Sequence, residues 1–98
     1  MSEELKQPVS RLGEEFQQFV AALEPLVEKT APDVGDDRAF LGRLSDLVPS
    51  QSRTADRLSP ADRTWLSALE EVVHRHDLSY ELVTNERGEG HLWLIPRH

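Results

Sequence analysis

The strongest pattern in this chain is an apolar stripe near its N-terminus. Seven apolar residues recur there at spacings of three and four: Leu5, Val9, Leu12, Phe16, Phe19, Leu23 and Leu26. This spacing puts them on one side of an α-helix, so the sequence predicts a long amphipathic helix that buries this side. We expect the helix to begin near Pro8, because proline suits an early helical position, and to be kinked or broken at Pro25. Residues 31–35, Ala-Pro-Asp-Val-Gly, end it.

The flanks of the stripe favour a globular core over a coiled coil. Val20 and Val27 widen the stripe at positions where a coiled coil normally carries charges. Phe16 and Phe19 are also bulky for a narrow two-stranded seam. We therefore expect only the first turns, before Phe16, to lack a neighbour within the chain.

Two shorter helices are predicted in the middle of the sequence. Asp36 or Asp37 can cap the first of them, which stops before Pro49 and has an inner face of Phe40, Leu41, Leu44, Leu47 and Val48. Polar residues 49–58 read as a mobile loop. The other helix has the clearest start signal, with Ser59 as the cap, Pro60 at the first helical position and Asp62 three residues after the cap. It is expected to run to about His76.

A β-hairpin is predicted at the C-terminus, because the apolar period changes to two after Asp77. Leu78, Tyr80 and Leu82 alternate with polar residues, and residues 85–90 carry strong turn chemistry. The second strand is apolar on both faces through residues 92–95. Either both of its faces are buried, or one apolar face is open for contact.

These elements define an α+β fold. The expected architecture is a three-helix core, with one long N-terminal helix and two shorter ones, followed by a C-terminal antiparallel β-hairpin. We treat residues 1–98 as a single domain, with residues 1–7 prone to fraying. The predicted core consists of Leu12, Phe16, Phe19, Leu23, Phe40, Leu44, Leu47, Trp65, Leu69, Val72, Leu82 and Leu94.

Composition narrows the classes of partner and compartment. The formal net charge is −7, from 18 acidic and 11 basic residues, which opposes general affinity for nucleic acid and for anionic membranes. The chain has no cysteine, so disulfides and thiolate chemistry are excluded. Neither a signal peptide nor an apolar run of about 20 residues is evident, so we expect a cytoplasmic protein without a membrane anchor.

Catalytic and cofactor motifs are not evident in the sequence. His74, His76 and Asp77 are near one another in the chain, and His91 lies across the hairpin, but residues two apart on a helix point to different faces, so His74 and His76 can share a metal only if the helix has already unwound. Paired acids such as Glu70 and Glu71 suit a solvated helix surface. We expect neither an enzyme nor a metal or cofactor.

The favoured functional hypothesis is a small acidic, non-catalytic protein-interaction module, such as an adaptor, regulator or inhibitor of a larger protein. Two apolar patches are the candidate partner-binding surfaces. One is the start of the first helix, and the other is the outward side of the last strand: Leu5, Val9 and Leu12, and Trp93 and Ile95. Self-association through either patch is part of the hypothesis.

The alternative hypothesis is a DNA-binding transcriptional regulator of winged-helix type. Three helices followed by a hairpin with a Gly/Arg tip are compatible with that arrangement, in which the third helix and the hairpin would contact DNA through Arg63, Ser67, Arg75 and Arg87. Glu70 and Glu71 would repel phosphate. The connection before the third helix is also longer than the turn of about 3–4 residues in a helix-turn-helix. The arginines of that connection, Arg53 and Arg57, suit a solvated connector better than a docking segment.

Overall fold

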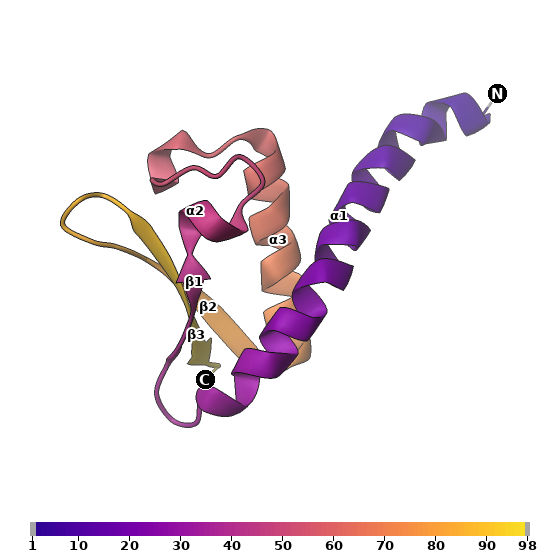
Figure 1. Cartoon of the computed structure of the whole chain (residues 1–98). Coiled ribbons are helices and arrows are strands. Elements are labelled where there is room, and N and C mark those ends of the chain that lie inside the picture. Colours follow the sequence, from indigo (N-terminus) through magenta and orange to yellow (C-terminus); the bar gives the residue numbers. More distant parts are fainter. Residues whose placement is uncertain (1, 98) are drawn as a thin grey trace.

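The computed structural model describes the backbone of residues 2–97 and the side chains of residues 13–97. The helices and strands follow the order α1 (Ser2–Thr30), β1 (Ala39–Arg43), α2 (Leu44–Leu47), α3 (Pro60–Arg75), β2 (Leu78–Thr84) and β3 (Gly90–Pro96). Two short 3₁₀ turns, η1 (Ala31–Asp33) and η2 (Ala55–Arg57), lie in the connections. The α+β class, the long N-terminal helix and the C-terminal hairpin are confirmed (Figure 1). Across residues 2–97, no helix combines the length and apolar character needed to cross a bilayer.

Helix α1 is longer than the sequence pattern suggested. It begins at Ser2 rather than near Pro8 and continues through Pro25 to Thr30, so the predicted break is absent. Pro25 and Ala21 are both exposed. Water can therefore satisfy the Ala21 carbonyl, which has lost its helical donor. Gly35, with φ of +53°, follows the end of the helix and turns the chain toward the sheet.

The predicted second helix is mostly wrong. Residues 39–43 form strand β1, and only Leu44–Leu47 are helical. Ala39 pairs with Leu94 and Phe40 with Trp93 on strand β3, so the ladder to β3 satisfies the backbone of this segment. Gly42 also disfavours a helix. The side chain of Leu47 packs against the Gly42 backbone so closely that a Cβ added to Gly42 would lie 2.9 Å from Leu47 Cδ1.

The three strands form an antiparallel sheet in the order β1-β3-β2. Helices α1 and α3 lie on the same side of this sheet (Figure 1). We call the side facing the helices the inner face and the opposite side the outer face. On β3, Gly90, Leu92 and Leu94 are buried, whereas the alternating residues are only half-buried. The central strand therefore supplies the core from its inner face and leaves its outer face partly open.

The core lies between α1, α3 and the inner face of the sheet. Buried residues that were predicted are Leu23, Leu44, Trp65, Leu69, Val72 and Leu94, and Phe16, Phe19, Leu47 and Leu82 pack at its edge. The sequence reading omitted Val20, Val27, Val34, Ala39, Leu41, Val48, Ala68, Val73 and Leu92. Phe40 was wrongly assigned to the core, since it is 47% exposed. Leu12 lies outside the residues whose side chains are described.

The start of α3 was predicted correctly and is reinforced by tertiary contacts. Ser59 Oγ accepts a hydrogen bond from Asp62 N at 3.1 Å, and Asp62 Oδ2 accepts one from Ser59 N at 2.9 Å, which completes a capping box. Asp62 also accepts hydrogen bonds from the backbone N and the hydroxyl of Ser50. This carboxylate thus fastens the connection between α2 and α3 to the helix start. Further along the same connection, Arg53 O accepts a hydrogen bond from Gly90 N at 2.9 Å. The mobility of residues 49–58 stays a prediction.

Candidate interaction surface

An aromatic cluster lies on the outer face of the sheet. We define this cluster, the aromatic face, by Phe40 on β1 and by His91 and Trp93 on β3. The Phe40 and Trp93 ring centroids are 5.1 Å apart in an edge-to-face arrangement, and the Phe40 and His91 centroids are 5.9 Å apart. Among the side chains of residues 13–97, Phe40 is the large hydrophobic residue that is exposed to solvent. The structure therefore gathers rings from two strands that are distant in the sequence.

Arginine and glutamate side chains frame the aromatic face. The Arg38 guanidinium carbon lies 4.2 Å from the centroid of the Trp93 ring, in a cation–π arrangement. Arg38 Nη1 also lies 3.6 Å from Glu81 Oε1, and both side chains are about half-exposed. Glu81 is directly opposite Trp93 in the β2–β3 register, so it shares the outer face. The exposed surface thus combines apolar rings with one ion pair that solvent screens.

The two predicted partner-binding patches have different outcomes. Trp93 and Ile95 are half-buried residues of β3 that both lie on the outer face, and Trp93 is paired with Phe40, but their binding role stays a prediction. Leu5, Val9 and Leu12 belong to α1, but their side chains lie outside the described residues, so that patch stays a prediction. Phe40 is the functional candidate that sequence reasoning missed. The only local signal against a helix is Gly42, because the short apolar run Ala39-Phe40-Leu41 shows no alternation.

The four residues of the DNA-binding hypothesis are not brought together as one basic surface. Arg63 and Arg75 lie at opposite ends of α3, about 18 Å apart along the helix axis. Ser67 borders a shallow hollow that also contains Glu70 and Glu71. Arg87 lies in the hairpin turn, which Asn85 organises by accepting hydrogen bonds from the backbone N atoms of Arg87 and Glu89.

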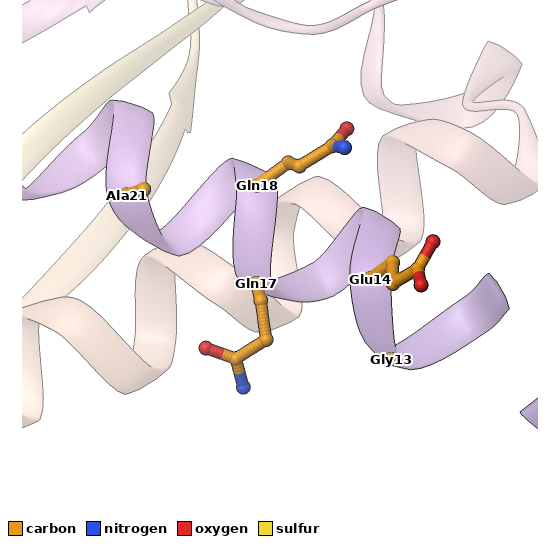
Figure 2. A pocket seen from close by; sticks show the side chains of 5 residues that line it. All are labelled: Gly13, Glu14, Gln17, Gln18 and Ala21. Carbon is orange, nitrogen blue, oxygen red and sulfur yellow. The ribbon is translucent and has the colours of Figure 1, made fainter. Parts of the chain in front are cut away.

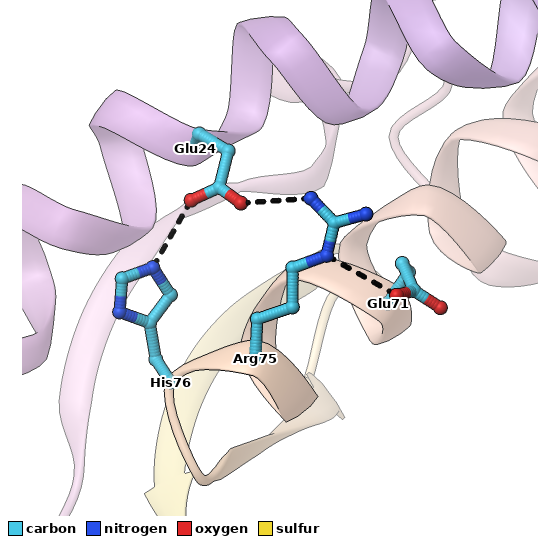
Figure 3. A network of polar contacts seen from close by, with 4 residues as sticks. All are labelled: Glu24, Glu71, Arg75 and His76. Carbon is cyan, nitrogen blue, oxygen red and sulfur yellow. Dashed lines mark hydrogen bonds and ion pairs between the residues drawn. The ribbon is translucent and has the colours of Figure 1, made fainter.

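Arg75 is occupied by a polar network that joins α1 to α3 (Figure 3). Its Nη1 donates to Glu24 Oε1 at 3.1 Å, and its Nε donates to Glu71 Oε2 at 3.2 Å. His76 Nε2 lies 3.1 Å from the other oxygen of Glu24. These hydrogen bonds, first from His76 and then from Arg75, hold the pKa of Glu24 below its ordinary value. The network explains how the ends of two helices are held together, and it places two carboxylates beside the Arg75 guanidinium, where they would repel phosphate.

Two features of the described residues concern metal and small-molecule binding. Across these residues, no three His, Cys, Asp or Glu side chains gather as a metal site. One surface hollow is lined only by residues of α1: Gly13, Glu14, Gln17, Gln18 and Ala21. Figure 2 shows that Gln17 and Gln18 point away from each other, and no second element supplies an opposing wall. This hollow is an open helix surface and not a substrate pocket.

Comparison with known proteins adds no relative. No family model, no curated protein and no solved structure matches this chain.

Proposed function

We propose that this chain is a small, non-catalytic protein-interaction module, an adaptor, regulator or inhibitor, that binds its partner through the aromatic face. The observation that carries the proposal is the 47% exposure of Phe40 beside Trp93 on the outer face of the sheet. Both rings come from the sheet itself, so the surface is held rigidly by backbone pairing. A rigid, preformed surface reduces the entropy cost of binding.

The chemistry of this surface suits a protein partner. Aromatic residues and arginine are enriched among the residues that contribute most to protein–protein binding. Full burial of a phenylalanine side chain contributes about 1.5–3 kcal/mol, and roughly half of that remains available at Phe40. Arg38 already covers the Trp93 ring, so a nucleobase would have to displace it before stacking there. The expected partner presents an apolar side chain to Phe40 and a carboxylate to Arg38.

Affinity capture from the source cells with matched variants tests this proposal. Phe40→Ser removes the exposed ring, whereas Gln17→Ser changes an exposed residue on α1 and serves as the control. A captured protein that is retained by the wild type and by Gln17→Ser should bind Phe40→Ser at least about tenfold more weakly. Equal binding to all three proteins, or the lack of any specific partner, would contradict the proposal.

One observation keeps DNA binding as a second candidate. The order helix, strand, helix, helix, strand, strand, with the first strand beside the last, is the element order of winged-helix domains. The pairing of Arg75 with Glu24 and Glu71 weakens this candidate. A winged-helix DNA binder should shift duplex DNA at low salt, with loss of binding in Arg63→Ala and Arg87→Ala. We expect no shift of mixed-sequence duplex DNA.

A further inference from the structure

The two edges of the sheet differ in how well they are protected. At the β1 edge, the strand has five residues, a register irregularity between Phe40 and Gly42, and an immediate passage into α2. Such bulges and short strands block pairing with another chain. At the other edge, β2 has seven residues in continuous register with β3 and contains no proline. Within residues 2–97, no strand pairs with the outer edge of β2.

The alternation of hydrogen-bonded pairs along the β2–β3 ladder shows which residues of β2 direct their backbone N–H and C=O groups toward this open edge. Asn85 N donates to Glu89 O at 2.9 Å, so this pair of residues is hydrogen-bonded across the hairpin. Hydrogen-bonded and non-hydrogen-bonded pairs alternate along an antiparallel ladder. The backbone groups of Leu78, Tyr80, Leu82 and Thr84 therefore point away from β3. The bond from Gly90 N to Arg53 O agrees with this alternation, because Gly90, the partner of Thr84, also directs its N–H away from the hairpin ladder.

The side chains of the same edge residues are apolar and incompletely covered. Leu78, Tyr80 and Leu82 lie at the margin of the core and are only half-buried. Burial, and secondarily the charge of Glu70 on α3, raises the pKa of the Tyr80 hydroxyl. The segment Leu78-Ser79-Tyr80-Glu81-Leu82 has the same apolar pattern in both directions about Tyr80. A segment with this symmetry can pair with itself around a two-fold axis.

We propose that two copies of this chain associate through their β2 strands, paired antiparallel about Tyr80 into one continuous six-stranded sheet. In this register, Tyr80 lies opposite Tyr80 of the second copy, and Leu78 lies opposite Leu82, which covers the half-buried apolar side chains. On the outer face, Ser79 lies opposite Glu81. Directly opposed groups on one face of a sheet interact most strongly, so these pairs decide the register.

The neighbouring registers are less favourable. A two-fold axis through Glu81 would place the two Glu81 carboxylates directly opposite each other, and like charges in that position are destabilising. An axis through Leu82 would place Tyr80 opposite Thr84, which is polar and exposed. Only the axis through Tyr80 matches apolar with apolar residues and avoids opposed carboxylates.

The net charge of the chain makes this association sensitive to salt. Each copy carries a formal charge of −7, and Glu70 of each copy lies on the α3 side of the joined edge, near Tyr80. Added salt screens this repulsion and should strengthen the dimer. The aromatic face is on the outer side of the sheet, so it stays open in the dimer.

Sedimentation over a concentration series from about 1 μM to about 1 mM tests the proposal. The wild type should show a monomer–dimer equilibrium. Ser79→Glu places a second carboxylate opposite Glu81 at two symmetric sites and should raise the dissociation constant of the dimer about tenfold. Ser79→Lys places a cation opposite Glu81 and should lower the dissociation constant of the dimer about threefold. Thr84→Glu adds the same charge to the same strand beyond the paired segment and should have a smaller effect than Ser79→Glu.

Amide hydrogen exchange gives a second readout that does not depend on a variant. In the dimer, the N–H groups of Tyr80 and Leu82 become hydrogen-bonded, so their exchange should slow as concentration rises. A monomer at about 1 mM, or a dimer that responds equally to Ser79→Glu and Ser79→Lys, would overturn the proposal. Phe40→Ser should leave the dimer intact, so failure of this inference and failure of the proposed function are distinguishable.

Discussion

Asp62 is a fully buried carboxylate that is held by hydrogen-bond donors. Burial by itself would raise its pKa, but the hydrogen bonds from Ser50 and Ser59 outweigh burial and hold the pKa of Asp62 below its ordinary value. The same side chain caps α3 and anchors the preceding connection. A single residue thus determines both where a helix starts and how the chain enters it.

We predict that Asp62→Ala lowers the free energy of unfolding by about 2–4 kcal/mol, since it removes the cap and leaves the N–H groups of Ser50 and Ser59 without an acceptor. Asp62→Asn keeps one acceptor oxygen and should cost less. Because the folded pKa is lowered, the stabilisation is present above the unfolded value of about 3.8 and is lost as pH falls through the folded pKa. Denaturant titration of the three proteins at several pH values measures both effects. A larger loss in Asp62→Asn than in Asp62→Ala would contradict this explanation.

At the scale of elements, α1 and α3 are joined by apolar packing and by Glu24. Val20, Leu23 and Val27 of α1 are buried together with Leu69 and Val72 of α3. Beyond this apolar contact, Glu24 bridges to Arg75 and His76 at the end of α3 (Figure 3). Arg75 and His76 lie at the C-terminal end of α3, where basic side chains interact favourably with the helix dipole.

Acid should weaken this junction. The lowered pKa of Glu24 means that its contribution is complete above its unfolded value of about 4.5 and is lost as pH falls through the folded pKa. We therefore predict that Glu24→Gln reduces stability at neutral pH and flattens the loss of stability between neutral and acidic pH. Glu28→Gln, an exposed residue on the same helix, is the control. Parallel pH profiles for wild type and Glu24→Gln would exclude the proposed role of this bridge.

At the scale of the whole molecule, the two faces of the sheet have separate roles. The inner face contributes Leu92 and Leu94, which are completely buried against the helices. The outer face contributes Phe40, which makes contacts within the sheet but stays 47% exposed. Stability depends mainly on the inner face, whereas the outer face supplies the candidate interaction surface.

This division predicts unequal costs for two truncations. Leu92→Ala should lower the free energy of unfolding by about 2–5 kcal/mol, because it leaves a cavity at the centre of the sheet. Phe40→Ala should cost about 1–2 kcal/mol, because it removes a ring that is only half-buried together with its contact with Trp93. Thermal or denaturant unfolding compares the two variants. If Phe40→Ala were as destabilising as Leu92→Ala, Phe40 would be a structural residue and its exposure would carry no functional argument.

The sequence by itself determined the elements whose signals are local. The 3.6-residue period of Phe16, Phe19 and Leu23 specified α1, the Ser59–Asp62 capping box specified the start of α3, and the alternation around Tyr80 specified the hairpin. In each case, the signal lies within the element itself, among residues that are close together in the sequence. In the last strand, the alternation of Leu92 and Leu94 with Trp93 and Ile95 placed the latter two residues on one side.

The tertiary structure decided what depends on distant partners. Residues 39–43 are too few to show a reliable period, and they form a strand because β3 offers them a hydrogen-bonding edge. That pairing moves Phe40 from an expected core position to the outer face, beside Trp93, and creates the aromatic face. It also makes β3 the central strand and leaves β2 as the regular open edge. Local patterns therefore predicted α1, the start of α3 and the hairpin, whereas the aromatic face and the open β2 edge depend on one long-range pairing of strands.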